Sequence, residues 1–272
     1  MSGEIHPTAI VHPGAVLGEG CTVGPYSIIG PNVVLGQRNR VGPHVVIEGH
    51  TLVGDDNQIF QFASVGAAPQ DLKYRGEPTV LQIGHRNVIR EFVTLQPGTV
   101  TGNKATRIGD QNLFMANCHV GHDGVVGSGN VFANSAALAG HVTVGNYATI
   151  GGLCGIHQFV SLGDQCILGA GSMVTRDIPP FSMAQGDRAG LVGLNRIGLE
   201  RRGASAEDIR RLRRLFRELF RGEGTMNARL ERLQREHAGF ELAERFLTFI
   251  VSSKRGITMP RRTRGGAAES AE

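Results

Sequence analysis

Residues 11–52 read VHPGAV LGEGCT VGPYSI IGPNVV LGQRNR VGPHVV IEGHTL when they are divided into blocks of six. An aliphatic residue opens every block, and the fifth residue is usually small, as at Ala15, Cys21 and Ser27. An amphipathic helix of 3.6 residues per turn cannot keep this period, and plain strand alternation would not restrict the fifth position. The pattern is typical of a triangular coil in which three blocks make one turn of 18 residues.

The repeat extends far beyond this stretch. It begins at Ile5, keeps its phase to Val65 and resumes at Ile83; after Leu95 it slips by one residue, and it then continues from Ile108 to Val174. Internal repeats of this kind predict a solenoid, here a mainly β parallel β-helix. The two interruptions, residues 66–82 and 96–107, are predicted to be loops at corners of the coil, where binding residues often lie.

Composition agrees with such a fold. The chain has 39 glycines, no Trp and 40% hydrophobic residues, but no apolar stretch near the roughly 20 residues that span a membrane. The N-terminus lacks a basic region followed by an apolar one, so we expect a cytoplasmic protein without stable membrane insertion. Every cysteine falls at the small fifth position of a block, which favours buried core thiols over disulfides, metal ligands or nucleophiles: Cys21, Cys118, Cys154 and Cys166.

The C-terminal third has a different pattern. Pro179 and Pro180 are expected to end the repeat, and Ser205 with Asp208 forms a capping-box signature ahead of residues with helical periodicity. We predict a β-helix domain over 1–190, a small α-helical domain over 191–255 and a disordered tail over 256–272. From Arg196 onward there are 18 Lys and Arg against 11 Asp and Glu, which suggests an acidic partner.

The 18-residue coil also predicts where histidines meet. The blocks that begin at Val120, Leu138 and Ile156 stack on one face, and they carry His122, His141 and His157. His119 lies at the corner just before that face. Imidazoles can act as a general base toward a hydroxyl. The alternatives are surface histidines without a role, or a zinc site to which His119 and His122 contribute across a subunit interface.

Asp123 follows His122 directly, but consecutive residues of a strand point to opposite sides. The sequence alone therefore predicts no His–Asp pair at this position.

Several segments resemble bacterial UDP-N-acetylglucosamine O-acyltransferases, which act in lipid A synthesis. They include QDLKYRGEPT (70–79), NCHVGHD (117–123), LAGHVTVG (138–145), AQGDRA (184–189) and GLNRIGLERRG (193–203), and the similarity covers about residues 5–255. The resemblance implies a left-handed coil and a homotrimer with sites between subunits. It also implies transfer of an R-3-hydroxyacyl chain from acyl carrier protein to the 3-OH of UDP-N-acetylglucosamine, without metal or cofactor. The acidic carrier protein would suit the basic helical part, and no motif for nucleic-acid binding is present.

The same resemblance assigns roles to individual residues. His122 matches the general base, Asp71 a residue near the sugar hydroxyls, and the N–H of Gly140 an oxyanion donor. Lys73 matches a substrate-positioning residue. The remaining matches are substrate-binding positions, the last three of them at the nucleotide end: Gln70, His119, His141, His157, Gln158, Ala170, Asn195, Arg201 and Arg202.

Two positions depart from the family pattern. Gln96 stands where many members have a histidine. Ala170 stands where many have a glycine and where side-chain size limits the acyl chain, which predicts a chain somewhat shorter than that of members with glycine. The alternatives that remain are a related UDP-sugar N-acyltransferase, whose extra N-terminal domain is not expected here, a trimeric zinc lyase like carbonic anhydrase, and a scaffold without catalysis.

Overall fold

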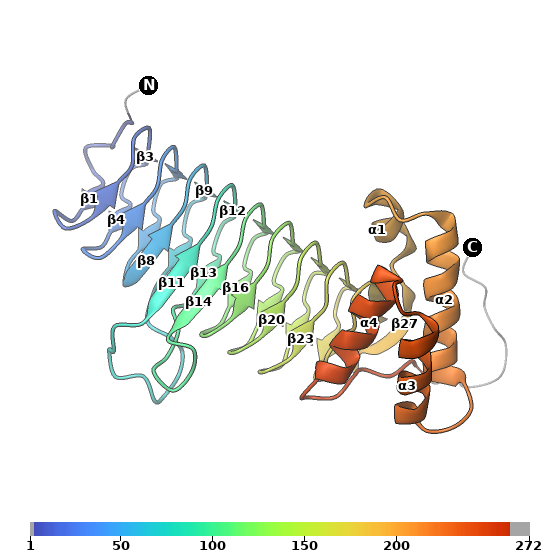
Figure 1. Cartoon of the computed structure of the whole chain (residues 1–272). Coiled ribbons are helices and arrows are strands. Elements are labelled where there is room, and N and C mark those ends of the chain that lie inside the picture. The colour runs from blue at the N-terminus through green and yellow to red at the C-terminus, as the bar shows by residue number, and fades with distance from the viewer. Residues whose placement is uncertain (1–2, 262–272) are drawn as a thin grey trace.

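The computed structural model describes residues 3–261, which form a long three-sided prism with a helical end (Figure 1). Ile10 pairs with Ile28 and Arg40 with Gln58, so a coil without an inserted loop takes 18 residues, as predicted. The strands stack into three sheets, one on each side of the prism. Among the described residues, no helix is both long and apolar enough to cross a membrane.

The three sheets are called faces 1, 2 and 3. Face 1 contains β1 (Ile10–Val11), β4 (Ile28–Ile29), β7 (Val46–Ile47), β10 (Ser64–Val65), β13 (Thr94–Leu95), β16 (His119–Val120), β19 (Ala137–Leu138), β22 (Gly155–Ile156) and β25 (Met173–Val174). Face 2 contains β2 (Val16–Leu17), β5 (Val34–Leu35), β8 (His50–Val53), β11 (Val80–Ile83), β14 (Ala105–Ile108), β17 (Val125–Val126), β20 (Thr143–Val144) and β23 (Ser161–Leu162). Face 3 contains β3 (Thr22–Val23), β6 (Arg40–Val41), β9 (Gln58–Ile59), β12 (Val88–Ile89), β15 (Leu113–Phe114), β18 (Val131–Phe132), β21 (Thr149–Ile150), β24 (Ile167–Leu168), β26 (Ser182–Gln185) and β27 (Gly190–Leu194).

The core of the prism is built from the repeat. The aliphatic residue that opens each block points inward, and side chains such as Leu35 and Ile47 are almost completely buried. Small residues at the fifth position fill the space beside them, and all four cysteines there are buried and free, as expected. Burying one such aliphatic side chain stabilises the fold by about 1.5–3 kcal/mol relative to exposing it.

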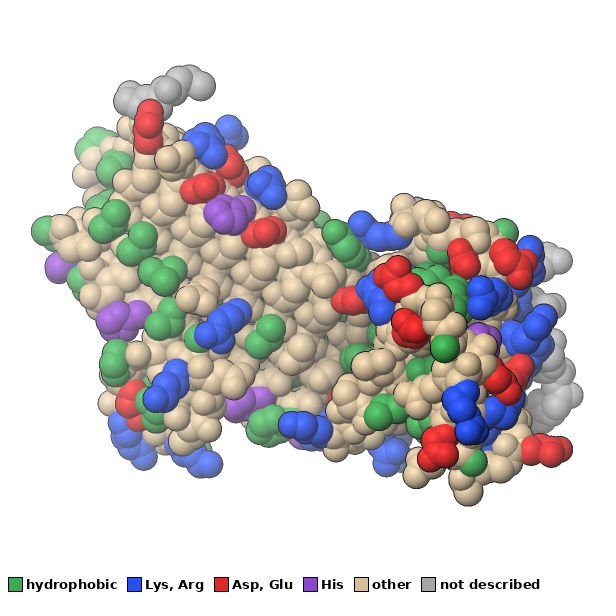
Figure 2. All heavy atoms as spheres, in the orientation of Figure 1, with side chains coloured by type: hydrophobic (Ala, Val, Ile, Leu, Met, Phe, Trp, Pro, Cys, Tyr) green, Lys and Arg blue, Asp and Glu red, His purple; other side chains and the backbone are tan. Residues whose placement is uncertain are grey.

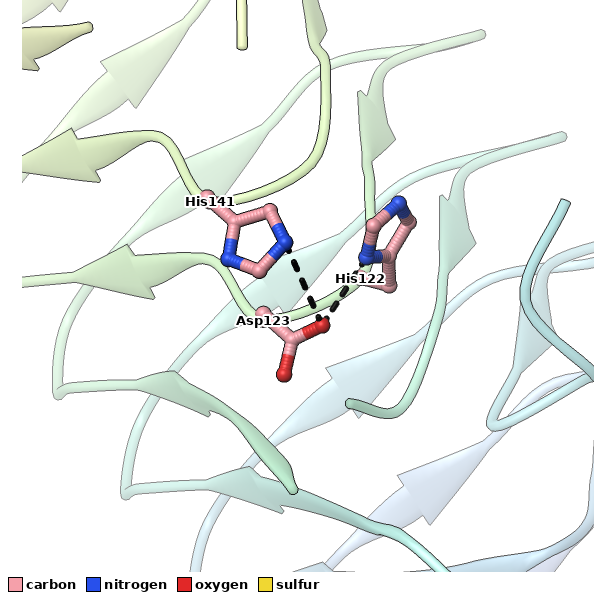
Figure 3. Close-up of side chains that lie close together, drawn as sticks. All are labelled: His122, Asp123 and His141. Atoms are coloured by element: carbon pink, nitrogen blue, oxygen red, sulfur yellow. Dashed lines mark hydrogen bonds and ion pairs between the residues drawn. The ribbon is translucent and has the colours of Figure 1, made fainter. Parts of the chain in front are cut away.

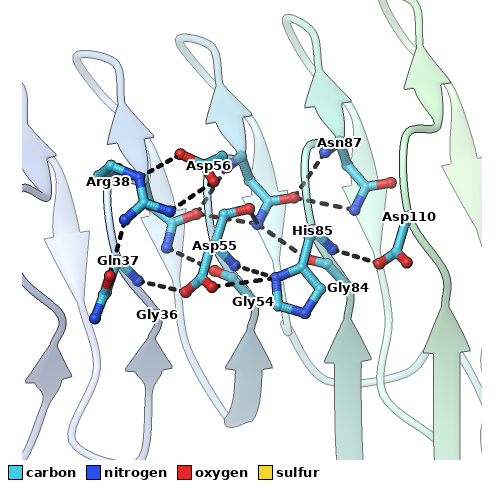
Figure 4. A network of polar contacts seen from close by, with 12 residues as sticks. Gly36, Gln37, Arg38, Gly54, Asp55, Asp56, Gly84, His85, Asn87 and Asp110 are labelled. Carbon is cyan, nitrogen blue, oxygen red and sulfur yellow. Dashed lines mark hydrogen bonds and ion pairs between the residues drawn. The ribbon is translucent and has the colours of Figure 1, made fainter.

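The corner between faces 2 and 3 is held by buried asparagines, the asparagine edge (Asn39, Asn57, Asn87, Asn112 and Asn130). The side-chain oxygen of each accepts a hydrogen bond from the backbone N–H one coil further along, for example from Asn87 to Asn57 at 2.8 Å. Outside this row, Asp55 and His85 bond to neighbouring coils, and Arg38 pairs with Asp56 at 2.7 Å (Figure 4). The polar groups of this edge are satisfied by the coil itself.

The helical end consists of α1 (Arg196–Arg201), α2 (Ala206–Arg221), α3 (Met226–Glu236) and α4 (Glu241–Ser252). The capping box of Ser205 and Asp208 starts α2, as the sequence predicted. These helices enclose a second hydrophobic core, which includes Leu212, Leu233 and Phe246. Charged side chains of both signs gather on this end of the molecule, whereas much of the prism face in view carries few (Figure 2).

Four expected boundaries are wrong. Residues 80–82 and 105–107 belong to β11 and β14, which pair along four residues, so both loops end three residues earlier than predicted. The coil does not stop at Pro179 and Pro180, because β26 adds one more parallel strand beside β24. Residues 256–261 are folded against the prism, with Ile257 bridging Asp177 and Pro260 bridging Leu191. The rest of the predicted tail, 262–272, lies outside the described residues.

Candidate active site

The corner between faces 1 and 2, the histidine edge, carries the loops and the paired imidazoles. Its successive corners include Gly121–Gly124, Ala139–Val142 and the residues after β22. Both inserted loops leave the prism at this same edge, since one joins β10 to β11 and the other joins β13 to β14. In Figure 1 they project together from one side of the prism. The histidines and the loops, which are far apart in the sequence, therefore share one edge.

His122 and Asp123 form a hydrogen-bonded pair at this edge. Nδ1 of His122 lies 2.9 Å from Oδ2 of Asp123, while the Nε2 atom on the other side of the ring is left for a substrate (Figure 3). The His122 side chain is 11% exposed and that of Asp123 is fully buried. A neutral imidazole held in this way carries its proton on Nδ1 and its lone pair on Nε2, which is the arrangement of a general base.

Strand alternation gave no ground for a His–Asp pair, but the structure has one. β16 ends at Val120, so His122 and Asp123 lie in the corner that follows it. Asp123 has φ of 60°, in the left-handed region, and this turn brings its carboxylate back beside the preceding ring. The same conformation recurs three residues after the block-opening aliphatic, as at Tyr26 and His141. Asp123 occupies this position in the block that begins at Val120, and that position is the sequence signal that could have revealed the pair.

Loop residues Gln96–Lys104 hold the carboxylate of Asp123. The Oγ1 of Thr99 donates to Oδ2 at 2.6 Å, its backbone N–H lies 3.1 Å from both oxygens, and the N–H of Asn103 donates to Oδ1 at 2.7 Å. Burial opposes ionisation, but these donors and His122 outweigh it and hold the pKa of Asp123 below its usual value. Sequence reasoning found none of these donors, because the loop has no repeat from which to place them.

His141 lies one coil beyond the pair. Its ring meets the ring of His122 edge to face at 5.1 Å between centroids and stacks on Phe159 at 4.5 Å. Burial lowers the pKa of His141, and the charges of Asp123 and Asp71 partly offset that effect. The imidazole is therefore mostly neutral near pH 7 and can donate or accept a hydrogen bond.

His119 lies on face 1, just before the corner. Its Nδ1 is 2.7 Å from Oγ1 of Thr94, and burial followed by the proximity of His122 lowers its pKa. His119, His122 and His141 thus come together, as the repeat predicted.

Gly140 lies directly against the imidazole of His122. A Cβ built on it would lie 2.5 Å from both Cε1 and Nε2 of that ring. The backbone N–H of Gly140 donates no hydrogen bond to any of residues 3–261, although the residue is buried. A free N–H on a residue that touches the imidazole is suitable for a developing negative charge on substrate.

The first loop brings Gln70, Asp71 and Lys73 to the same edge. Asp71 accepts a hydrogen bond from the backbone N–H of Lys73 at 2.9 Å, and the Lys73 side chain is exposed. The backbone N–H of Gln70 donates to Oε1 of the buried Gln96 at 3.2 Å, so the two loops are joined. Gln96, the departure from the family pattern, is thereby a link between loops.

His157 lies one coil further along and does not join the imidazole cluster. It occupies an earlier position in its block than His141 does, and its exposed ring accepts a hydrogen bond at Nδ1 from Arg255 at 2.8 Å. Gln158, beside it, is also exposed. The prediction that His157 stacks with His122 and His141 is therefore wrong.

Four predicted site residues lie on other edges of this chain. Ala170 is at the corner between faces 3 and 1. Arg201 ends α1, and the guanidinium of Arg202 covers the ring of Tyr147 at the corner between faces 2 and 3. Asn195 is buried, and its amide caps α1 at Gly198 and donates to the carbonyl of Gln165. A single chain does not bring these residues to His122.

His122, Asp123 and His141 also have the composition of a metal site, since one potential ligand atom from each lies within 4.8 Å of the others. The carboxylate, however, already accepts hydrogen bonds from Thr99 and Asn103, and Nδ1 of His122 bonds to it directly. Donors that converge on a carboxylate favour an orienting role for it over metal ligation.

Comparison with known proteins identifies the family. A model of UDP N-acetylglucosamine O-acyltransferase domain 2 matches residues 177–258, and a bacterial transferase hexapeptide model matches 3–37 and 14–49. An acyl-[acyl-carrier-protein]–UDP-N-acetylglucosamine O-acyltransferase of Myxococcus xanthus is 56% identical over 94% of this chain and 99% of its own, and one of Thiobacillus denitrificans is 53% identical over 93% and 98%.

The fold agrees with a solved relative. The crystal structure of UDP-N-acetylglucosamine O-acyltransferase from Moraxella catarrhalis superposes with a TM-score of 0.90 at 41% identity, covering 93% of this chain and 99% of that one. The predicted left-handed β-helix with a helical C-terminal part is therefore confirmed. The chain belongs to the acyl-[acyl-carrier-protein]–UDP-N-acetylglucosamine O-acyltransferase family and is an acyltransferase.

Proposed function

We propose that the enzyme transfers an R-3-hydroxyacyl chain from acyl carrier protein to the 3-OH of UDP-N-acetylglucosamine, the first step of lipid A synthesis, with His122 as general base. The observation that carries this proposal is the buried His122–Asp123 pair at the edge where both loops meet. The names of the relatives supply the substrate classes.

The proposed mechanism uses both nitrogens of the His122 imidazole, Nε2 toward the substrate and Nδ1 toward Asp123. Nε2 of His122 takes the proton of the sugar hydroxyl as its oxygen attacks the thioester carbonyl, and the negative charge of Asp123 stabilises the imidazolium that forms. When the tetrahedral intermediate collapses, the C–S bond breaks and the departing thiolate receives the proton from Nε2. General-base catalysis of this kind typically contributes about 10²- to 10⁴-fold to the rate.

The neighbouring groups complete the mechanism. The unpaired N–H of Gly140, next to the ring, stabilises the oxyanion of the intermediate. Asp71 and Lys73, on the first loop, contact the sugar and position it, while His119, His141, His157, Gln158 and Gln70 line the substrate groove.

The position of the other predicted residues supports a site shared between subunits. Ala170 and Arg202 lie on different edges of the prism from His122, so one chain cannot bring them to the same substrate. In a homotrimer, the edge with His122 of one subunit would face another edge of its neighbour. Arg201 and Arg202 would bind the diphosphate, and Ala170 would limit the acyl chain.

Charge and cysteine chemistry support the partner and the compartment. The excess of Arg in the helical part suits an acidic carrier protein. The four cysteines are buried and form no disulfide with one another, which fits a reducing cytoplasm.

The test is acyl transfer from R-3-hydroxyacyl carrier proteins of graded length to UDP-N-acetylglucosamine and to its 3-amino analogue, with the products identified by mass. His122→Ala should lower kcat by about 10³-fold with unchanged circular dichroism. A preference for the amino analogue would instead indicate an N-acyltransferase, and a preference for longer over shorter chains would contradict the role of Ala170.

The matched control is His6→Ala, which removes an exposed histidine of the first coil, several coils away from His122. It should retain the parent rate. Equal rates for His122→Ala and His6→Ala would show that His122 is not the base. Metal analysis of the purified trimer separates the acyltransferase mechanism from a zinc lyase.

A further inference from the structure

The loop Gln96–Lys104 is tied to the prism through one carboxylate. Thr99 is 2% exposed and directs both its hydroxyl and its backbone N–H at Asp123, while Asn103 adds a further N–H. The loop also passes very close to this side chain, because a Cβ on Gly102 would lie 2.5 Å from Oδ2 and 2.6 Å from Oδ1. Only a glycine lets the loop close over the carboxylate in this way.

A carboxylate beside an imidazole has two rotatable bonds and two equivalent oxygens. If nothing else bound Asp123, it could rotate and leave Nδ1 of His122 without an acceptor, and the ring could then change its tautomer. The 2.6 Å bond from Thr99 Oγ1 goes to Oδ2, the same oxygen that bonds His122. The hydroxyl therefore fixes the oxygen on which the orientation of the base depends.

We propose that Thr99 is a positioning residue for acyl transfer: its hydroxyl holds Asp123 so that His122 presents Nε2 to the sugar hydroxyl. The second loop is then part of the catalytic machinery, although it acts through another residue. This inference rests on the proposed role of His122 and goes beyond it, because it assigns a function to a loop that the hexapeptide repeat does not require.

The experiment compares Thr99→Val and Thr99→Ser in the full-length enzyme, with steady-state kinetics for R-3-hydroxyacyl carrier protein and UDP-N-acetylglucosamine. Valine has the shape of threonine but no hydroxyl, so the fold should be kept. Thr99→Val should lower kcat by roughly tenfold or more, the size expected for a lost hydrogen bond to a charged group. KM for the UDP-sugar should change by less than about twofold, and Thr99→Ser should restore most of the rate.

The matched control is Thr106→Val on β14, directly after the loop. Thr106 is fully buried, and its hydroxyl has no partner among the described residues, so its removal should leave kcat unchanged. Gly102→Ala is a second, independent variant, whose Cβ would push the loop off Asp123 and should lower kcat at least as much as Thr99→Val.

The outcomes separate the two proposals. If the parent enzyme shows no transfer, or His122→Ala keeps its rate, the proposed function fails. If the parent is active and depends on His122, but Thr99→Val keeps a kcat equal to that of Thr106→Val, the positioning role of Thr99 is wrong. A loss in Thr99→Val that serine does not restore would also overturn it.

Discussion

The asparagine edge and the histidine edge are two corners of the same prism, and they satisfy their polar groups in opposite ways. At the asparagine edge, each buried amide bonds to the coil on either side, as Asn87 does to Asn57 and Asn112. At the histidine edge, Asp123 instead bonds to Thr99 and Asn103 of an inserted loop. One corner closes on itself, whereas the other needs a loop and leaves Nε2 of His122 for a substrate.

The difference shows where stability and activity are separated in this fold. A group that bonds within the repeat can be removed only at the expense of the coil. A group that bonds to a loop can be changed while the coil remains intact.

Asn87→Ala should have the largest effect on stability. It removes the bonds to Asn57 and Gly109 and leaves the buried N–H of Asn112 without its acceptor. The free energy of unfolding should fall by on the order of 3 kcal/mol or more. Urea unfolding followed by circular dichroism measures this loss, while kcat of the folded fraction should stay near the parent value. The control Gln58→Ala, at an exposed residue of face 3, should change little; equal midpoints for the two variants would contradict the structural role of the row.

A pair of glycine variants should separate the two edges. At Gly84, a Cβ would lie 2.8 Å from the backbone carbonyl of Gly109, so Gly84→Ala should lower stability with little effect on kcat. At Gly140, the three atoms nearest the added Cβ would all belong to the imidazole of His122, so Gly140→Ala should displace the base and lower kcat by about 10²-fold with a small change in stability. Parallel denaturation and kinetics test both, and the same pattern in the two variants would mean that the edges do not differ.

Acid should lower the stability of the histidine edge at a higher pH than that of the asparagine edge. This change in the free energy of unfolding should be the smallest of the predicted effects. Burial lowers the pKa of His119 from 6.5, so the neutral form is favoured in the folded state. The stability is complete above about pH 6.5, begins to fall there because the unfolded chain binds the proton more readily, and is lost as the pH falls through the lower pKa of the folded state. At the asparagine edge, the bond from Arg38 lowers the pKa of Asp56 from 3.8, so its contribution persists to much lower pH.

His119→Gln should therefore lose less stability than the parent between about pH 7.5 and pH 5.5. Urea midpoints at the two pH values measure the difference. His50→Gln, which changes an exposed histidine, is the control and should follow the parent. A His119→Gln midpoint that falls as steeply as that of the parent would rule out this contribution.

The repeat made most of the fold predictable because its period has a direct geometric meaning. Three blocks of six place Ile29 above Val11 and below Ile47, and the coil then follows without further information. Prediction failed where the chain leaves the period: residues 80–82 extend β11, and β26 continues face 3 beyond two prolines. Those strands are set by pairing with a neighbouring coil, which no local pattern reveals.

For the site, the repeat predicted which coils carry His122 and His141, but not how their side chains turn. The pairing of His122 with Asp123 depends on a left-handed residue at the corner, and strand alternation gave the wrong answer there. Thr99 and Asn103 were missed because a loop brings them to the site from a distant part of the sequence. The role of Gln96 as a link between loops likewise required a three-dimensional contact.

The two loops enter the coil without disturbing its pitch. Val65 and Ile83 are 18 residues apart and Leu95 and Ile108 are 13 apart, where an uninterrupted repeat would have six, yet the strands on both sides remain in register. Insertions at this edge therefore need not respect the hexad. During evolution, the part of the chain that meets a substrate could vary in length while the packed interior stayed constant, and an engineer could exchange these segments without redesigning the core.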